Sequence, residues 1–274
     1  MSKLRPSAKK TGKERRGKKA SNQFGRELSL VPIFLAKEIG PGDSIVDLLL
    51  QSLREHNVAF EAGDILVVKH KIVSKAEGCL VDLTTIKPSA DSIAWGEKYK
   101  LDARVIEVAL RESRAVIRRK HGVLITETRH GFICANGGVD VSNVDGGQHA
   151  LLLPADPDRS ARRLHRDLKK RTGFAIPVLI TDTFGRPWRE GLVDFCIGVA
   201  GMKSLRDDRG QLDPHGYKLH ASFEAVADEL AAAAALVCGK LNRTPACIIR
   251  GFPYEPARGH TRDLLRPAAT DLFR

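Results

Sequence analysis

Apolar residues recur at helical spacing in four segments of the chain. Residue types that suit helix ends flank these segments. Asp102 and Asp156 are suited to cap a helix start, Pro157 to occupy a first turn, and Gly173 and Gly239 to follow a helix end. The predicted helices cover residues 42–57, 101–113, 156–173 and 222–237.

Shorter apolar runs between these segments predict strands. Residues 65–68, 175–180 and 246–251 are typical of buried strands, and residues 123–127 and 132–135 flank an Arg-His-Gly turn that predicts a hairpin. No internal repeat is visible. Strands mixed with helices predict a mixed α/β or α+β class. We expect residues 27–274 to form one domain, with a division into two subdomains as the alternative.

Four polar segments follow apolar ones, and we expect them to be loops that carry the chemistry. Lysines and a terminal glycine in the first segment suit phosphate oxygens. Carboxylates and neutral oxygen donors in the second and third suit an oxygen-preferring cation, so together the segments favour a Mg²⁺- or Mn²⁺-nucleotide site. The segments are 69–78, 135–147, 180–191 and 238–245.

Each of these groups also has a purely structural interpretation. Asp182 can cap a turn, and Asp140 can accept a hydrogen bond from its own following backbone. The lysines of residues 69–78 can form a solvated face, and His70 can be a buried or surface histidine without a chemical role. Residue type alone does not choose between the two interpretations.

The positive charge of the chain is concentrated at its start. Residues 1–26 hold nine of the net twelve positive charges and few apolar residues, which predicts a disordered basic tail. Such a tail either aids solubility or binds a polyanion such as nucleic acid. The remaining chain has little net charge and lacks the interleaved aromatic and basic residues of single-strand binders, which argues against nucleic acid as the partner of the body.

The cysteines and the hydropathy indicate a cytoplasmic protein. The five cysteines are scattered, form no C-x-x-C pair and lie in apolar segments, so we expect reduced, buried thiols and no zinc site. No apolar run is long enough for a membrane helix, and no apolar segment follows the basic start as in a secretory signal. We therefore expect no membrane association.

Several motifs, in order, resemble those of coenzyme F420-0:L-glutamate ligases, the γ-glutamyl ligases of deazaflavin cofactor biosynthesis. They are KIVSKAEG, CANGGVDVSNVDGG, LLLPADPDRSARRL, ITDTFGRPWREG and CIGVAGMKSL, and the resemblance covers about residues 30–274. It implies a fold particular to the family and an intertwined homodimer.

The resemblance also implies a reaction. GTP is the co-substrate and phosphorylates a carboxylate of F420-0, and the amine of L-glutamate then attacks the acyl phosphate. GDP and phosphate are released, and some family members add further γ-linked glutamates. Mg²⁺ or Mn²⁺ is the implied cofactor, with room for a monovalent cation such as K⁺.

Residue by residue, the resemblance places metal ligands on Asp140, Asp182 and Thr183 and a catalytic charge on Lys75. Arg186 and Arg189 are expected to hold anionic substrate or phosphate. The family's early Gly-Leu-Pro nucleotide loop corresponds to Leu35, Ala36 and Lys37 here. The expected nucleotide contacts are Leu35, Ala36, Lys37, Lys69, His70, Ser74, Lys75, Asn143, Gly239 and Lys240.

Two alternatives to this function remain at this point. The same scaffold can serve an amide ligase that activates a different carboxylate by phosphorylation. A nucleic-acid-binding protein that uses the basic tail belongs to another class altogether. The acceptor, the number of glutamates added, the choice between GTP and ATP and the metal are not fixed by the residues.

Overall fold

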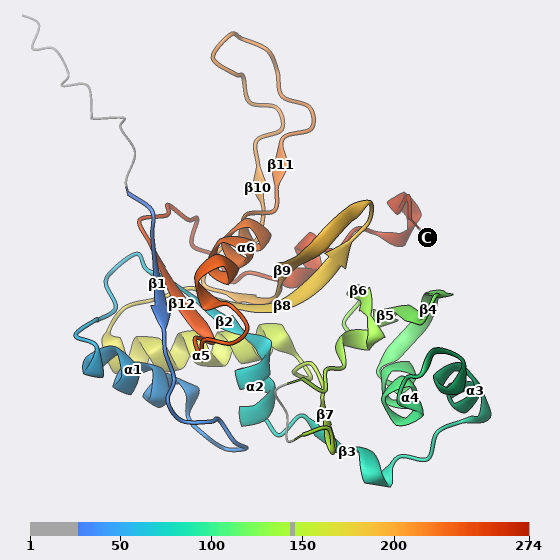
Figure 1. Ribbon diagram of the computed structural model, residues 1–274. Coiled ribbons are helices and arrows are strands. Elements are labelled where there is room, and N and C mark those ends of the chain that lie inside the picture. Colours follow the sequence, from blue (N-terminus) through green and yellow to red (C-terminus); the bar gives the residue numbers. More distant parts are fainter. Residues whose placement is uncertain (1–26, 143–145, 274) are drawn as a thin grey trace, which may run out of the picture.

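A five-stranded sheet forms the centre of the larger of two lobes in the computed structural model, which describes residues 27–142 and 146–273 (Figure 1). Only β2 and β8 run parallel; the other neighbours are antiparallel. The basic tail expected at residues 1–26 lies outside the described residues. In sheet order the strands are β1 (Ser29–Ile33), β12 (Ala246–Arg250), β2 (Ile65–Lys69), β8 (Val178–Arg186) and β9 (Arg189–Ala200).

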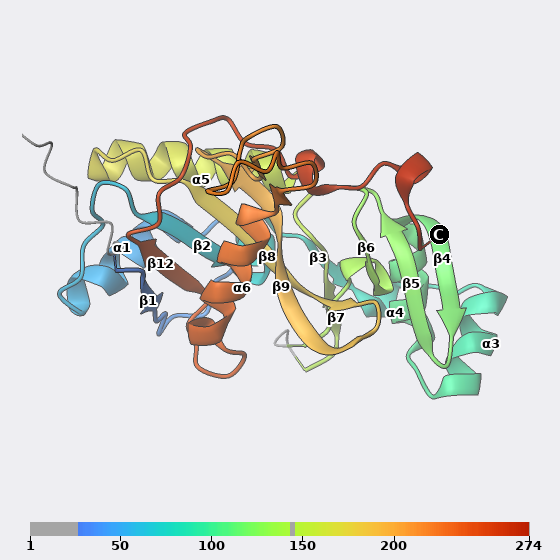
Figure 2. The ribbon, with the colours of Figure 1, turned by 90° about the horizontal axis from the view of Figure 1, so that it is seen from above.

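Helices cover both faces of this sheet (Figures 1 and 2). Helices α1 (Ile45–Glu55) and α5 (Pro157–Thr172) pack on one face, and α6 (Val226–Cys238) packs on the other. Because side chains alternate along a strand, Leu66 faces α1 and α5 while its neighbour Val67 faces α6. Burial on both faces explains why the central strands are almost continuously apolar.

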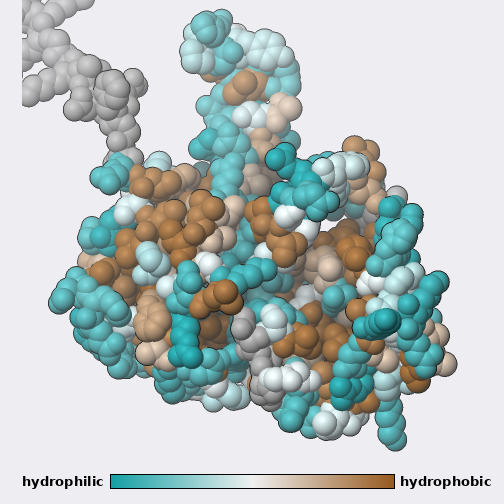
Figure 3. All heavy atoms as spheres, in the orientation of Figure 1, coloured by the Kyte–Doolittle hydropathy of each residue, from teal (hydrophilic) through white to brown (hydrophobic). Residues whose placement is uncertain are grey.

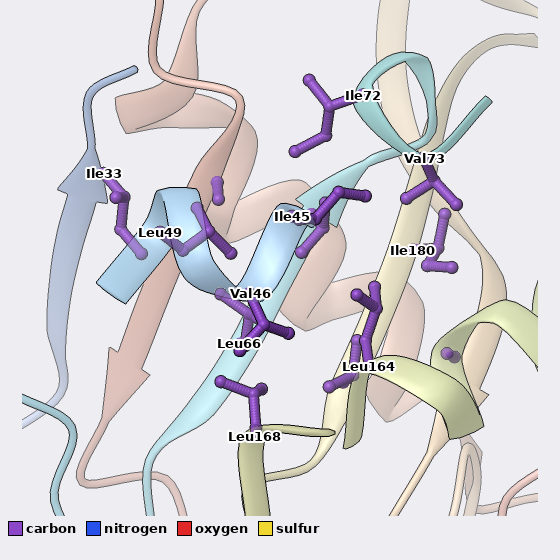
Figure 4. Packing of buried hydrophobic residues seen from close by; sticks show 14 of the residues in the cluster. Ile33, Ile45, Val46, Leu49, Leu66, Ile72, Val73, Leu164, Leu168 and Ile180 are labelled. Carbon is purple, nitrogen blue, oxygen red and sulfur yellow. The ribbon is translucent and has the colours of Figure 1, made fainter. Parts of the chain in front are cut away.

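Leucine and isoleucine side chains fill the layer under α1 and α5. Figure 4 shows Leu49 of α1 and Leu164 and Leu168 of α5 converging on Leu66 and Ile180 of the sheet. All five are buried. Burying such a side chain is worth about 1.5–3 kcal/mol, so this layer is a main source of stability for the larger lobe.

A smaller lobe lies beside the sheet and has its own core around Ile106, Ala109 and Leu124 (Figures 1 and 2). Two short strands connect the lobes. The elements of the smaller lobe are α3 (Ala90–Tyr99), α4 (Ala103–Arg111), β4 (Ser113–Lys120), β5 (Val123–Thr128) and β6 (Ile133–Ala135), and the connecting strands are β3 (Leu80–Asp82) and β7 (His149–Leu151).

The remaining elements are short. Strands β10 and β11 form the base of an arm that projects from the body (Figure 1). Helix α2 directly follows β2. These elements are α2 (His70–Ala76), β10 (Arg206–Asp207) and β11 (Phe223–Glu224), with 3₁₀ turns at Leu83–Thr85, Asn136–Gly138, Thr261–Leu264 and Ala268–Thr270.

The predicted mixed α/β class is confirmed, and so are most of the predicted elements. The Asp102 and Asp156 side chains cap α4 and α5 by accepting hydrogen bonds from the amides of Arg104 and Arg159, both at 2.8 Å. Gly173 ends α5 with φ of 82°. The hairpin of residues 123–135 forms as β5 and β6.

Three assignments are wrong. The first polar segment, residues 69–78, is mostly helix α2 rather than a turn, because Ile72 and Val73 pack into the core beside its lysines. The third, residues 180–191, is a hairpin of β8 and β9 rather than a loop, because residues 181–184 pair with β9. The last helix begins at Val226, since Phe223 and Glu224 pair with β10.

The thiols are largely buried, as expected. Cys134, Cys196, Cys238 and Cys247 are buried, whereas Cys79 is only partly so, and all five cysteines are free. Among the helices of the described residues, none combines the length and apolar character needed to span a membrane.

The contact between β9 and the start of α5 predicts an intolerant glycine. A Cβ atom on Gly198 would lie 2.5 Å from the backbone oxygen of Pro157, at the first turn of α5. We expect Gly198→Ala to force the helix away from the sheet and to lower the free energy of unfolding by about 1–3 kcal/mol, as overpacking does. Urea denaturation measures this change.

Gly185→Ala is the matched control, because Gly185 also lies in the β8–β9 hairpin but a Cβ there would meet nothing nearer than 4.0 Å. Equal stability of the two variants would show that the Gly198 contact does not constrain the packing of α5.

Candidate functional site

A cleft of about 860 Å³ opens at the carboxyl ends of β2 and β8. Two parallel neighbours end at the same edge of a sheet, so the residues that follow them meet there. The cleft is lined by side chains from the segment before α1, the start of α2, β8 and the connection between α6 and β12. It therefore joins segments that are far apart in the sequence.

Two carboxylates in the cleft contact consecutive residues of α2. Asp182 Oδ1 lies 3.2 Å from Nε2 of His70, and Asp140 Oδ2 lies 2.6 Å from Nζ of Lys71. The Asp182 carboxylate also accepts a hydrogen bond from the Thr183 amide at 2.7 Å. The start of α2 thus brings together an aspartate of the central sheet and one that pairs with the connecting strand β7.

Asp140 also accepts a hydrogen bond from the Ser142 amide at 2.7 Å, which is the local turn expected of such an aspartate. Burial raises the pKa of Asp140, but the hydrogen bonds from Lys71 and the Ser142 amide outweigh burial, and its pKa lies below the usual value. Asp140 is therefore ionised at neutral pH. The Asp140 side chain thus forms a local turn and also lines the cleft.

Asp182 and Thr183 point to opposite faces of the sheet. Asp182 is on the side of His70, whereas the Thr183 hydroxyl donates to Oδ1 of Asp194 at 2.8 Å on the side of α6. Asp194 Oδ2 accepts from the Thr181 hydroxyl at 3.0 Å and also pairs with the ammonium of Lys69. Neighbouring residues of β8 therefore serve two sides of the strand.

A bulge adjusts the pairing of β8 with β9 at this place. Ile180 pairs with Gly198, but Thr181 pairs with Cys196, so Ile197 is an extra residue in β9. Beyond the bulge, Thr183 and Asp194 are direct partners.

Basic side chains outnumber acidic ones along the cleft. Among the described residues, six lysines and arginines line it, against the three acids Glu38, Asp140 and Asp182. A cleft with this excess attracts anions such as phosphates. The basic residues are Lys37, Lys69, Lys71, Lys75, Lys240 and Arg243.

Asp182 also acts on a thiol of the smaller lobe. Burial, and then the negative charge of Asp182, raise the pKa of Cys134 on β6 to about 12. This thiol is therefore protonated at neutral pH and is no nucleophile. The effect of Asp182 on Cys134 shows that β6 of the smaller lobe lies close to the cleft.

A comparison with known protein families decides the kinship of the chain. Residues 35–251 match the family model described as F420-0:Gamma-glutamyl ligase. The chain belongs to the F420-0:gamma-glutamyl ligase family. The matched range contains every described residue that lines the cleft.

Relatives named coenzyme F420:L-glutamate ligase support this membership. The protein of Methanothermobacter thermautotrophicus is 44% identical over 250 residues, which cover 90% of this chain and 99% of the relative. The protein of Methanopyrus kandleri is 42% identical over 252 residues, covering 90% and 98%. That of Methanocaldococcus jannaschii is 40% identical over 215 residues, covering 78% and 86%.

Most of the site residues suggested by the family resemblance line the cleft, but some do not. Ala36, Ser74, Arg186 and Arg189 are not among the lining residues; Ser74 is fully buried within α2, and the arginines flank the turn of the β8–β9 hairpin. Asn143 lies outside the described residues. Those that line it are Leu35, Lys37, Lys69, His70, Lys75, Asp140, Asp182, Thr183, Gly239 and Lys240.

The structure adds residues that the sequence did not single out. Lys71 holds Asp140, Glu38 pairs with Lys75, and Asp194 holds Lys69 and both threonines. A signal for Asp194 was present, because a charged residue inside the apolar run of residues 192–200 is costly to bury unless it has partners. Its partners were not readable, since they lie on two other strands.

The donor set suits an oxygen-preferring cation in part. Asp140, Asp182 and Thr183 supply carboxylate and hydroxyl oxygens of the type that Mg²⁺ and Mn²⁺ take. Within residues 27–142 and 146–273 there is no group of three or more acids, histidines or cysteines that could hold a metal ion unaided. A cation here would therefore need oxygens from a bound nucleotide or water, as Mg²⁺ commonly does.

Two lysines of the cleft differ in how they affect folding. Lys69 is 20% exposed and pairs with Asp194, which is 4% exposed, whereas Lys75 is 13% exposed and one of its partners, Glu38, is 79% exposed. We expect Lys69→Met to lower the free energy of unfolding by about 3 kcal/mol, because it leaves a buried carboxylate without its cation. Lys75→Met should cost less than about 1 kcal/mol, since Glu38 stays hydrated.

Chemical denaturation of both variants at one pH measures the difference. Equal losses in the free energy of unfolding would mean that water screens the Lys69–Asp194 pair to the same extent as the Lys75–Glu38 pair.

Proposed function

We propose that the protein is a GTP-dependent ligase that forms an amide between a carboxylate of coenzyme F420-0 and L-glutamate. GTP phosphorylates the carboxylate and leaves as GDP, and the glutamate amine attacks the acyl phosphate and releases phosphate. Addition of further γ-linked glutamates is an extension of the same chemistry. The protein would act in the cytoplasm.

The observation that carries the proposal is the cleft itself, in which two carboxylates from segments far apart in the sequence lie among several lysines. Phosphoryl transfer depends on positioning and on neutralising the charge of the phosphate oxygens, and this set of side chains supplies both. The name shared by the relatives points to F420 and L-glutamate as the substrates.

Asp140 and Asp182 are the proposed carboxylate ligands of the cation, and Thr183, whose side chain lies on the opposite face of β8 beside Asp194, is the proposed ligand on that side of the cleft. Mg²⁺ or Mn²⁺ held by these residues would neutralise charge on the nucleotide phosphates. In this structure the Lys71 ammonium pairs with the Asp140 carboxylate and also lies 2.8 Å from the Ser142 hydroxyl. If a cation were held by the Asp140 carboxylate, the Lys71 ammonium would be available to bind phosphate oxygens in the cleft.

Lys75 is the proposed catalytic charge and offsets the charge of the phosphoryl group as it moves. Its side chain faces the cleft from the last turn of α2. Leu35 and Lys37 on one side, and Gly239 and Lys240 on the other, are the proposed contacts with the base and ribose; Ala36 lies between two of them but does not line the cleft. Arg186 and Arg189 are proposed to hold anionic substrate at the end of the β8–β9 hairpin.

We also propose a homodimer. Helix α6 is apolar almost all around, and Leu236 on its outer side is 83% exposed; Figure 3 shows hydrophobic residues gathered over this helix. A helix of this kind is normally covered. The arm of β10 and β11 projects from the body with Leu212 and Tyr217 exposed (Figure 1). Light scattering should give the mass of two chains.

The reaction is tested by mass spectrometry of F420-0 incubated with the protein, L-glutamate, either GTP or ATP, K⁺, and either Mg²⁺ or Mn²⁺. We expect a product heavier by one glutamate residue, formed with GTP and a divalent cation. Further mass increments would show continued addition. No product from F420-0, but nucleotide hydrolysis with another carboxylate and an amine, would replace F420-0 by a different acceptor.

Loss of one carboxylate should weaken the proposed cation site. Asp182→Asn preserves shape and removes a charge, so folding should survive while turnover falls by about 10²-fold or more and Mn²⁺ binds less tightly with GTP present. Asp140→Asn should behave alike, and the double variant should lose much less than the sum because the two residues act together. Calorimetric titration of Mn²⁺ measures the affinity.

Asp208→Asn is a suitable control, because Asp208 lies in the arm and should not affect Mn²⁺ affinity. Unchanged affinity in both cleft variants would mean that Asp140 and Asp182 are turn and packing residues only.

Lys75→Met should lower kcat by about 10²-fold or more while the protein keeps its melting temperature, as expected when a charge that acts in the transition state is lost. Single-turnover kinetics with saturating GTP would measure the chemical step. Full turnover in the folded variant would exclude a catalytic role of Lys75.

A further inference from the structure

Asp194 is a buried carboxylate that touches three residues of the cleft but does not line it. Its side chain is 4% exposed. Oδ1 accepts from the Thr183 hydroxyl at 2.8 Å, and Oδ2 accepts from the Thr181 hydroxyl at 3.0 Å and from the ammonium of Lys69. Lys69, Thr181 and Thr183 all line the cleft.

Strand register creates this arrangement. Thr183 and Asp194 are direct partners across β8 and β9, and Lys69 and Thr181 are direct partners across β2 and β8. Side chains of paired residues lie on the same face, and so do residues two apart on one strand. Three strands therefore direct these four side chains to the α6 side of the sheet.

The contacts explain how a charged carboxylate is tolerated in this position. A buried carboxylate is costly unless it is paired with a cation and hydrogen-bonded, and Asp194 has one cation and two hydroxyl donors. The same contacts restrict the donors: the Lys69 ammonium and the Thr183 hydroxyl are each held on an immobile acceptor.

We propose that Asp194 is a positioning residue that fixes the Lys69 ammonium and the Thr183 side chain at the cleft. The inference rests on the proposed function, in which Lys69 and Thr183 face the nucleotide and its cation. Because Asp194 neutralises Lys69, the role of Lys69 is directional: it donates hydrogen bonds from a fixed point, and net positive charge comes from the other lysines of the cleft.

The holding of Lys69 can be measured without any ligase reaction. Reductive methylation with formaldehyde and borohydride modifies lysine amines, and peptide mass spectrometry gives the rate at Lys69. We expect Asp194→Asn to raise this rate at least about fivefold, because the ammonium loses its charged acceptor. Methylation of Lys98, which lies in the other lobe, serves as an internal standard.

Asp228→Asn is the matched control. Asp228 is a partly buried carboxylate on α6 that accepts a hydrogen bond from the Cys196 amide of the same strand β9 at 2.8 Å, and it does not line the cleft. We expect this variant to leave the methylation rate of Lys69 and the ligase kinetics unchanged, even if its melting temperature falls.

Kinetic measurements on the same variants test whether this positioning matters for the reaction. We expect Asp194→Asn to lower kcat by about 10²-fold with a smaller change in KM. Combining it with Lys69→Met should add little to the larger single effect, since both changes break one contact. A purely structural role would give additive losses and would affect Asp228→Asn as much.

If Asp194→Asn does not fold, Thr181→Val provides a second test. This variant removes one hydroxyl donor to Asp194 at nearly constant shape. We expect it to raise the methylation rate of Lys69 about twofold. An unchanged methylation rate in the folded variant overturns the inference. If the wild type makes no product, the proposed function fails, while faster methylation still upholds the fixing of Lys69 by Asp194.

Discussion

The parallel pairing of β2 with β8 is the constraint on which the site depends. It is the only parallel pair of this sheet within residues 27–142 and 146–273, and it ends with Lys69 beside Thr181. Every other neighbour runs antiparallel, so at no other place in this sheet do two neighbouring strands end at the same edge. The start of α2 and the far half of β8 diverge from this point, and the space between them and the connection from α6 is the cleft.

Packing on both faces makes that pairing rigid. The leucines of α1 and α5 press on one side and the alanines of α6 on the other, so β2 and β8 have little freedom to shift. A site built at the end of such strands is positioned by the core rather than by loops. Small changes deep in the core should consequently reach the cleft through the strands, not through the surface.

How far the sequence predicts this structure depends on whether a signal is local. Caps such as Asp102 and Asp156 and the apolar spacing of α1, α4 and α5 are local, and these elements were predicted correctly. Strand β1 contains Pro32, and β4 is an edge strand in which three apolar residues are followed by three basic ones, so neither resembles a buried strand. Helix α2 was missed because its lysines suggested a phosphate loop, although Ile72 and Val73 are buried on its inner side.

The candidate site shows the same limit. Asp140, Asp182 and Lys75 could be named from their residue types and from the family resemblance, and the structure brings all three to one cleft. The roles of Glu38, Lys71 and Asp194 could not be assigned, because each pairs with an oppositely charged residue that is 37 to 125 positions away in the chain. Only the register of strands and the placement of α2 reveal them.

The single extra residue in β9 has a consequence for how this hairpin can change. Without Ile197 as a bulge, the continued ladder would place Phe195 opposite Thr183, and Asp194 would turn to the other face of the strand. Because of the bulge, the side chains in the outer half of β9 alternate one residue out of register with those in its inner half, which packs in the core. Core and chemistry on one strand can follow separate alternations: removal of Ile197 would leave Thr183 opposite Asp194, whereas pairing of Ile197 with Thr181 would turn the polar side chains to the aromatic side.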